Sequence, residues 1–186
     1  MITAALVILI GGSLLFFLIV LYNRLVRLRN TVQSSWSDID VQLKKRYDLV
    51  PNLVETVKGY AAHEKSVLEQ VTQARSSALQ AASPSAKARA ENHFQETLKS
   101  LFALAEAYPD LKANVNFAQL QSQLQALEDN LESARRYYNA VVRDYNTLIE
   151  SFPSNLVASS FQFSVKDFFE LEAPATERQP VKVSFS

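Results

Sequence analysis

The most constraining feature of the sequence is an N-terminal run that contains no charged residue, from Ile2 to Tyr22. As an α-helix this run would extend about 31 Å, at roughly 1.5 Å per residue, which matches the hydrocarbon core of a bilayer. Fourteen of its positions are Leu, Ile, Phe or Val, and each such residue favours membrane insertion by about 0.3–0.6 kcal/mol near the membrane centre. The run predicts a single transmembrane helix, with residues 1–23 as the anchor.

The charges that flank the run predict whether it is cleaved and how it is oriented in the membrane. A secretory signal peptide carries positive charge before its apolar stretch and small residues after it. Here no Lys or Arg precedes the stretch, and Arg24, Arg27 and Arg29 follow it. We therefore expect an uncleaved anchor that contacts the lipid bilayer through residues 2–22. Because positively charged flanks stay on the cytoplasmic side, we expect an inner (cytoplasmic) membrane protein whose C-terminal domain lies in the cytoplasm.

Composition narrows the possible functions. The 186 residues are enough for one domain beside the anchor. The 19 basic and 19 acidic residues balance, so no nucleic-acid partner is expected. The absence of cysteine excludes disulfides, thiolate zinc sites and cysteine nucleophiles. Only three glycines occur, two of them inside the anchor, which excludes phosphate-binding glycine loops and favours long helices.

An apolar stripe continues beyond the anchor with steps of three and four residues. Its members are Leu28, Val32, Trp36, Ile39, Leu43, Tyr47 and Val50. This eleven-residue repeat is typical of a nearly straight helical seam, so the first helix should run from the membrane into the domain. Pro51 disfavours a helical conformation at the preceding residue. We expect the chain to reverse near residues 48–51, the alternative being a kink in one long helix.

Three further helices are expected, over about 52–81, about 86–107, and from an Asn116–Gln119 capping box to Pro153. The last has an a/d seam over five heptads. The seam consists of Phe117, Leu120, Leu124, Leu127, Leu131, Ala134, Tyr138, Val141, Tyr145, Leu148 and Phe152. It suits either a buried bundle or a coiled coil with another chain, and the other amphipathic helices favour the bundle. The predicted fold is all-α: the transmembrane helix followed by an antiparallel four-helix bundle over residues 24–153.

The last segment, residues 154–186, has a different pattern. Phe161, Phe163 and Val165 alternate with polar residues, and residues 181–185 alternate again, which indicates a short strand or an extended segment. The tail could fold back on the bundle or dock on a partner or a membrane. If the chain reverses near residue 50, Phe161, Phe163, Phe168 and Phe169 would lie at the water–lipid interface, where aromatic rings are favoured.

The sequence contains no pattern typical of a catalytic or metal centre. Helical bundles hold metal pairs with Glu-x-x-His motifs, and neither His63 nor His93 belongs to one. No serine is part of a recognisable nucleophile–base arrangement. We therefore predict no catalytic, cofactor-binding or metal-binding residues, which disfavours a hydrolase or a metal oxidase. The basic run 44–46 is interpreted as a solvated face, because it lies about 20 residues beyond the span.

Several motifs resemble those of the LemA family of bacterial membrane proteins. The matching segments are 22–23, 29–30, 36–46, 48–54, 57–61, 63–64, 108–113, 116–117, 134–139, 143–146 and 152–155. They occur in order along nearly the whole chain, and the last 25 or so residues match only loosely. The resemblance implies a single-pass membrane protein with a four-helix-bundle domain, and it supplies no catalytic residues. Asn52, Asn139 and Asn146 fall within these motifs, and we interpret them as polar clamps between helices rather than as ligand sites.

The expected function is that of a membrane-anchored scaffold or adaptor without catalytic activity, in protein–protein interaction or membrane organisation. Related proteins have been linked to membrane organisation, which agrees with an anchored scaffold. The alternative is a regulatory subunit that binds a membrane enzyme or protease. The protein partner is not specified by the sequence, and a second copy of the chain is one candidate.

Overall fold

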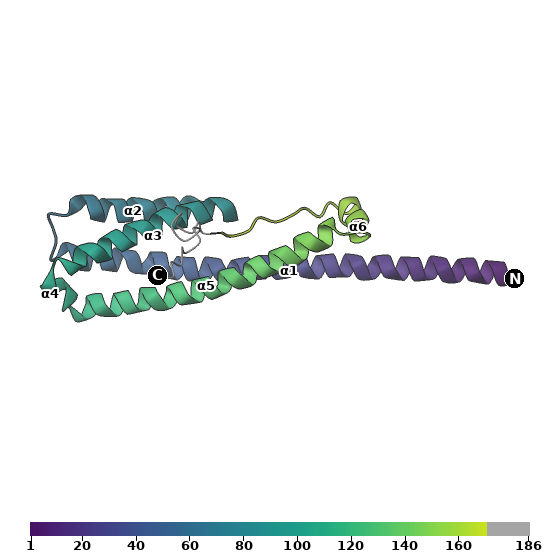
Figure 1. The fold of residues 1–186 in the computed structure, drawn as a ribbon, viewed down its shortest axis with the longest axis horizontal. Coiled ribbons are helices and arrows are strands. Elements are labelled where there is room, and N and C mark those ends of the chain that lie inside the picture. The colour runs from purple at the N-terminus through teal and green to yellow at the C-terminus, as the bar shows by residue number, and fades with distance from the viewer. Residues whose placement is uncertain (171–186) are drawn as a thin grey trace, which may run out of the picture. The chain divides into compact units, whose positions relative to one another are not determined.

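The computed structural model describes residues 1–170, and within that range it contains helices and no strand (Figure 1). The helices are α1 (Ile2–Lys58), α2 (Lys65–Gln80), α3 (Pro84–Glu106), α4 (Pro109–Lys112), α5 (Val115–Glu150) and α6 (Ser154–Ser160). The chain divides into two compact units. One combines Met1–Leu43 with Asp129–Phe168, and we call it the membrane-proximal unit. The other contains Lys44–Glu128 and begins again at Phe169, and we call it the bundle unit. The all-helical class predicted from the sequence is confirmed.

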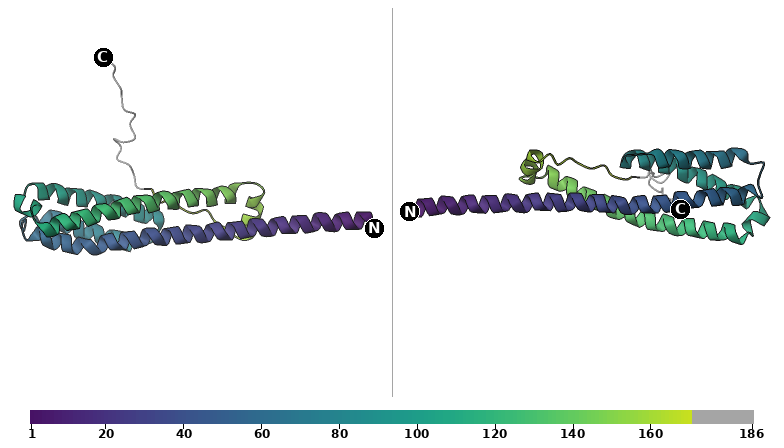
Figure 2. Two further views of the ribbon diagram at one scale, coloured as in Figure 1. Left: turned by 90° about the horizontal axis from the view of Figure 1, so that it is seen from below. Right: turned by 180° about the vertical axis from the view of Figure 1, so that it is seen from behind.

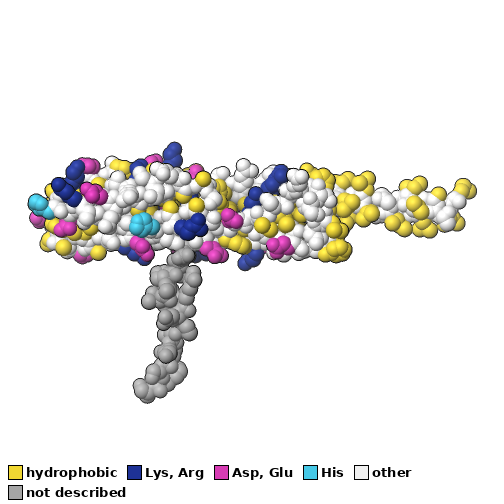
Figure 3. All heavy atoms as spheres, turned by 90° about the horizontal axis from the view of Figure 1, so that it is seen from above, with side chains coloured by type: hydrophobic (Ala, Val, Ile, Leu, Met, Phe, Trp, Pro, Cys, Tyr) yellow, Lys and Arg dark blue, Asp and Glu magenta, His cyan; other side chains and the backbone are white. Residues whose placement is uncertain are grey.

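The first part of α1 is long and apolar enough to cross a membrane. Its large side chains are exposed, for example Ile2, Ile8 and Phe16 at 70% or more. Figure 3 shows hydrophobic side chains and no charged ones on the N-terminal end of the chain. A contiguous apolar surface of this kind is rare on soluble monomers and marks contact with a membrane or another protein. The helix therefore has the properties that the sequence predicted for the anchor.

The bundle unit contains four helical segments, namely the end of α1, then α2, α3 and the beginning of α5. Successive segments run in opposite directions (Figures 1 and 2). Their facing side chains form an apolar core in which Leu53, Val71, Phe94 and Leu101 are almost completely buried. The periodic apolar stripes pack against one another in this unit, so the structure has the predicted antiparallel four-helix bundle.

The predicted reversal near residues 48–51 is wrong, because α1 continues through Pro51 to Lys58. Proline has no amide hydrogen, so the carbonyl four residues earlier, that of Tyr47, loses its helical donor. Arg75 of α2 supplies a replacement, since its Nε donates to the Tyr47 carbonyl oxygen at 2.7 Å. The chain reverses at residues 59–64 instead. The predicted second helix is consequently divided between the end of α1 and α2.

The other helix boundaries are close to the predicted ones, and their caps are identifiable. The Ser83 hydroxyl accepts from the Ala86 amide at 3.1 Å and caps α3, with Pro84 at its first position. At the start of α5, the Asn114 side chain accepts from the Phe117 amide at 3.0 Å. The predicted cap at Asn116 is therefore wrong by two residues.

In the membrane-proximal unit, α5 lies beside α1 and runs in the opposite direction (Figures 1 and 2). The Trp36 and Tyr138 rings meet with their centroids 5.4 Å apart. Along this part of α5 the predicted seam is buried at Leu131, Tyr138 and Tyr145 and continues to Leu148. The seam ends there, because Phe152 is 81% exposed.

A helix interrupts the predicted tail. After α6, Gln162 adopts a φ of 56°, and the amides of Gln162 and Phe163 donate to the carbonyls of Ser159 and Ala158 at 3.3 and 2.9 Å. This is a Schellman motif, in which glycine is the usual left-handed residue. The chain then runs extended to residue 170. An extended segment, rather than a strand, therefore follows α6, and the alternation at 181–185 lies outside the described residues.

Candidate functional site

An aromatic cluster closes the membrane-proximal unit at the end of the apolar span. Tyr22 is the last residue of the uncharged run, and its ring centroid lies 4.7 Å from that of Phe161 and 5.9 Å from that of Phe163. The Arg29 guanidinium stands over the Phe163 ring, 5.3 Å from its centroid. Such a cation–π contact contributes about 0.5–2 kcal/mol, depending on desolvation. The predicted proximity of Phe161 and Phe163 to the end of the anchor is therefore confirmed, although the chain reverses at a different residue.

The extended segment after α6 is held on α5 by the side chain of Asn146. Its amide nitrogen donates to the Lys166 carbonyl at 2.9 Å, and its amide oxygen accepts from the Lys166 amide at 2.9 Å. At the next residue of the segment, the Tyr138 hydroxyl donates to the Asp167 carbonyl at 2.8 Å. Burial raises the pKa of Tyr138 to about 12, and the charge of Asp167 acts in the same direction. The hydroxyl is therefore protonated, and can donate, at any physiological pH.

The structure corrects the interpretation of two asparagines as polar clamps between helices. Asn146 clamps a non-helical segment rather than a second helix, and Asn52 has an exposed side chain on α1. The segment runs from Phe163 along α5 toward Tyr138, away from the end of the span. Phe169 is completely buried. The prediction that Phe168 and Phe169 lie with Phe161 at the water–lipid interface is therefore wrong.

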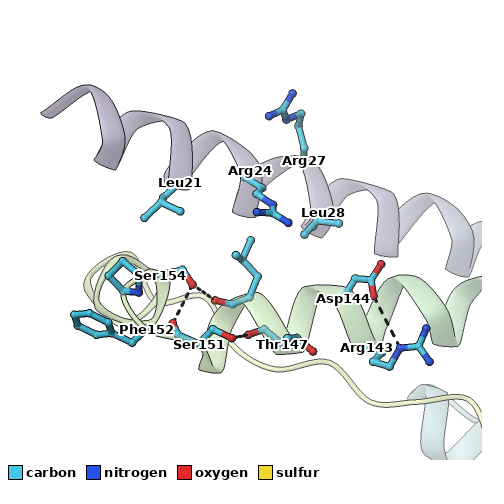
Figure 4. Close-up of a pocket in the computed structure, with 12 residues that line it drawn as sticks. Leu21, Arg24, Arg27, Leu28, Arg143, Asp144, Thr147, Ser151, Phe152 and Ser154 are labelled. Carbon is cyan, nitrogen blue, oxygen red and sulfur yellow. Dashed lines mark hydrogen bonds and ion pairs between the residues drawn. The ribbon is translucent and has the colours of Figure 1, made fainter. Parts of the chain in front are cut away.

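Next to the aromatic cluster lies an open groove with a volume of about 720 Å³. Its α1 wall includes Leu21, Arg24 and Arg27, and its α5 wall includes Arg143 and Thr147. We call it the arginine groove. Figure 4 shows Arg24 extending from α1 toward α5, while the Arg27 side chain points from α1 away from α5.

The groove has an excess of positive charge that the protein does not neutralise. Asp144 is the acidic residue among the lining side chains, and it faces Arg143 at 3.9 Å with both side chains about 70% exposed. Within residues 1–170, Arg24 and Arg27 have neither an ion-pair partner nor a side-chain hydrogen bond. Two guanidinium groups, each with five donors in a planar fork, are therefore available to a ligand with several acceptor oxygens.

A second polar cluster lies inside the bundle unit, around Arg46. This arginine is 4% exposed, and its Nη1 lies 3.1 Å from a carboxylate oxygen of Glu91 and 3.1 Å from one of Glu128. Its guanidinium also stands over the Phe94 ring, 5.1 Å from the centroid. The Tyr47 hydroxyl donates to the other Glu91 oxygen. Three elements, α1, α3 and α5, thus meet at one buried cation.

Glu91 is the most perturbed group of this cluster. Burial raises the pKa of its carboxyl above the ordinary 4.5, while the Arg46 guanidinium and the Tyr47 hydroxyl lower it. The charge of Glu128 acts with burial, and that of Lys87 acts against it. A pocket of about 180 Å³ borders the cluster at Arg46 and Glu128. Because each charge is compensated by a neighbour within the protein, the arrangement is suited to fixing the register of three helices.

The sequence analysis missed this cluster. It placed all of residues 44–46 on a solvated face, which holds for Lys44 and Lys45 but is wrong for Arg46. A signal was present on the partner helix, because Glu91, Phe94 and Leu98 are spaced by three and four residues. A carboxylate on an apolar stripe requires a buried cation or a proton.

The structure leaves both histidines at the surface. His63 and His93 are both exposed. Glu64 is half-buried and accepts a long hydrogen bond of 3.4 Å from the Tyr108 hydroxyl. Among residues 1–170, no three His, Asp or Glu side chains are close enough to share a metal ion.

Comparison with known proteins identifies the family. A family model described as LemA family matches residues 35–185. The chain belongs to the LemA family. Protein LemA of Metamycoplasma hominis is 26% identical, over 87% of this chain and 74% of that protein. Magnetosome protein MamQ 1 of Paramagnetospirillum magneticum is 24% identical, over 85% of this chain and 67% of that protein. Magnetosome protein MamQ of Magnetospirillum gryphiswaldense has the same identity and coverage.

The family assignment confirms the resemblance seen in the sequence motifs. It indicates, with the apolar part of α1, that this LemA-family chain is a membrane-associated protein. The names of these relatives denote no enzymatic activity.

Proposed function

We propose that this LemA-family protein is a membrane-anchored helical scaffold or adaptor without catalytic activity, which acts in protein–protein interaction or membrane organisation. The observation that carries the proposal is the continuity of α1. One helix contains both the apolar span Ile2–Tyr22 and core residues of the bundle such as Leu53 and Val57. The bundle is therefore joined to the anchor by helix and not by a Gly- or Ser-rich linker. Such a construction suits a protein that presents a surface at a membrane.

A groove in the bundle unit supports a role in protein interaction. It lies between the end of α1 and α2 and has a volume of about 760 Å³. Its walls combine apolar side chains, such as Val54 and Leu68, with charged ones, such as Lys58 and Glu69. A mixture of an apolar floor and a polar rim is common at interfaces between proteins that also exist separately.

The proposal includes a location and a topology. Residues 2–22 lie in the inner (cytoplasmic) membrane, and the rest of the chain lies in the cytoplasm. Deleting residues 1–23 should release the protein from the membrane fraction, and a reporter fused after Ser186 should be active only in the cytoplasm. A truncated chain that still sediments with membranes would contradict the single anchor, and a reporter active only outside would contradict the topology.

Site-specific crosslinking tests the interaction function. A photoreactive residue at Thr72, in the α1–α2 groove, should form a discrete adduct in intact cells. The same residue at Gln123, which is exposed on α5 in the bundle unit, is the matched control. An adduct specific to Thr72, with a non-enzymatic protein or with a second copy of the chain, supports the scaffold. No adduct from either position would count against an interaction surface here.

The alternative, a regulatory subunit of a membrane enzyme or protease, predicts a different adduct. The crosslinked protein would then be that enzyme, and its activity in proteoliposomes would change when the purified chain is added. An unchanged activity would leave the scaffold as the better account.

A further inference from the structure

We propose that the arginine groove binds the phosphate headgroup of an anionic phospholipid of the membrane that α1 spans. The inference uses the anchor of the proposed function and does not depend on the scaffold role. It follows from four observations on the membrane-proximal unit, which concern depth, charge, the neighbouring apolar groove and the available donors.

The groove begins at the depth of lipid headgroups. Its first lining residue, Leu21, belongs to the last turn of the span. Arg24 and Arg27 follow Tyr22 by about 3 and 7.5 Å along the helix axis, at roughly 1.5 Å per residue. The headgroup region adds about 5–8 Å to each side of a hydrocarbon core about 30 Å thick. Both guanidinium groups therefore lie in the layer that contains the phosphates.

The charge of the groove favours an anionic headgroup over a zwitterionic one. Three arginines line it together with one aspartate, and Arg24 and Arg27 have no anionic partner in residues 1–170. Arg29, the remaining arginine of the flank, is engaged with Phe163. A choline headgroup would bring its own cation next to the guanidinium groups, whereas a glycerol headgroup would leave the phosphate charge uncompensated.

A second groove, deeper along α1, can accommodate the acyl chains. It has a volume of about 410 Å³ and lies between α1 and α6, with walls formed by Leu15, Leu18 and Ile19 on one side and Leu156 and Val157 on the other. These α1 residues are within the span, about one and a half to two and a half turns before Arg24. Leu156 and Phe161 on the other side are 58% and 60% exposed. The arginine groove lies just after the span and the apolar groove lies within it, so the two follow the order of headgroup and acyl chains in a phospholipid. A free phosphate ion would occupy only the arginine groove.

Donor geometry agrees with a phosphodiester as the ligand. Guanidinium groups bind phosphate oxygens through two parallel hydrogen bonds. The Ser151 and Ser154 hydroxyls in the groove wall already donate to backbone carbonyls, so the side chains left to hold the ligand are Arg24, Arg27 and the Thr147 hydroxyl. We therefore assign the recognition to the arginines and not to the serines.

Lipid retention by the full-length protein tests the inference. The protein is purified in micelles that contain equal amounts of phosphatidylglycerol and phosphatidylcholine, and retained lipids are counted by native mass spectrometry. Wild type should retain phosphatidylglycerol preferentially. Arg24→Gln with Arg27→Gln should weaken that retention about 30-fold, since each arginine near a membrane surface contributes roughly a five-fold affinity factor and the two factors multiply. Both side chains are exposed, so the variant should fold, which its circular dichroism will verify.

The control variant is Lys44→Gln with Lys45→Gln. It removes the same charge from exposed positions of α1 outside the arginine groove, and it should retain phosphatidylglycerol like wild type. Equal loss in the two double variants would overturn the proposal, because it would show a general charge effect. Equal retention of the two lipids by wild type would overturn it as well.

Competition distinguishes the lipid from a free phosphate. Millimolar inorganic phosphate, or the deacylated headgroup glycerophosphoglycerol, should not displace phosphatidylglycerol, because neither fills the apolar groove. Complete displacement by either would overturn the lipid assignment. In every sample, retention of phosphatidylcholine reports that the anchor is in a lipid environment. A loss of phosphatidylglycerol preference in the groove is therefore distinguishable from a loss of lipid contact by the anchor.

Discussion

Replacement of Arg46 by Met is the sharpest test of the buried cluster in the bundle unit. The substitution keeps a long side chain that can still pack on Phe94 but removes the cation between Glu91 and Glu128. Glu91 is 1% exposed, so its carboxylate would be left in the core without the Arg46 cation, although the Tyr47 hydroxyl would still donate to it and the charge of Lys87 would still act on it. Glu128, with 28% of its side chain exposed, can turn to water.

The magnitude follows from the burial of Glu91. Removing one partner of a buried ion pair costs about 3–5 kcal/mol, which is a large fraction of a total stability of roughly 5–15 kcal/mol. For a chain of this length it corresponds to a fall in Tm of about 6–20 °C. Urea titration and thermal unfolding of the full-length protein in micelles, followed by far-UV circular dichroism, would measure both quantities.

The loss should also depend on pH, with a sign that the structure determines. Because the pKa of Glu91 in the folded state is raised above 4.5, its contribution to stability is greatest below that value and declines as the pH rises through the folded-state pKa. Removing Arg46 takes away a group that lowers this pKa. The destabilisation by Arg46→Met should therefore be larger at about pH 8 than at about pH 5. Adding Glu91→Gln should recover most of it and remove the pH dependence.

Arg136→Met is the matched control. Arg136 pairs with Glu132 on the surface of α5, where both side chains are at least half exposed, and its loss should change the unfolding free energy by less than about 1 kcal/mol. If Arg46→Met and Arg136→Met have the same effect, or if Glu91→Gln does not rescue Arg46→Met, the reasoning about the buried cluster is refuted.

Three further predictions concern the seam, a cap and the tail. Leu131→Ala should lower the unfolding free energy by about 2–5 kcal/mol because Leu131 is 2% exposed; a loss below about 1 kcal/mol, measured by urea titration, would mean that α5 packs differently. Asn114→Ala should cost about 1 kcal/mol by removing the cap of α5, and equal thermal shifts for Asn114→Ala and Asn116→Ala would contradict this assignment. Asn146→Ala should speed amide hydrogen exchange in residues 164–168 about tenfold or more, since two hydrogen bonds hold that segment; Asn130→Ala, on an exposed position of the same helix, should leave the exchange unchanged.

The position of Phe161 near the span was predicted correctly, although the first reversal of the chain was placed at the wrong residues. The sequence analysis placed the first reversal at Pro51, whereas the chain reverses at residues 59–64. The number of reversals before α5 is unchanged, so α5 still returns toward the span and Phe161 meets Tyr22. Counting helices was sufficient for this conclusion, because the direction of an antiparallel helix depends on the parity of the turns and not on their exact residues.

The properties that could be predicted from the sequence are those that arise within one stretch of chain. An uncharged run longer than 20 residues predicts the anchor, because no partner is needed to make it apolar. Steps of three and four residues predict the helices and their buried faces, because the helical period is a local property. The end of α3, one residue before the predicted one, is local in the same sense.

Features that depend on a residue far away in the chain could be seen only in the folded protein. α1 passes through Pro51 because Arg75 donates to the carbonyl that proline leaves without a donor. Arg46 is buried rather than solvated because carboxylates on α3 and α5 compensate its charge. Asn146 clamps the extended segment because the turn after α6 returns the chain to α5. In each case the cost of burying or interrupting a polar group is offset by a partner from another element, and periodicity within one stretch carries no information about that partner.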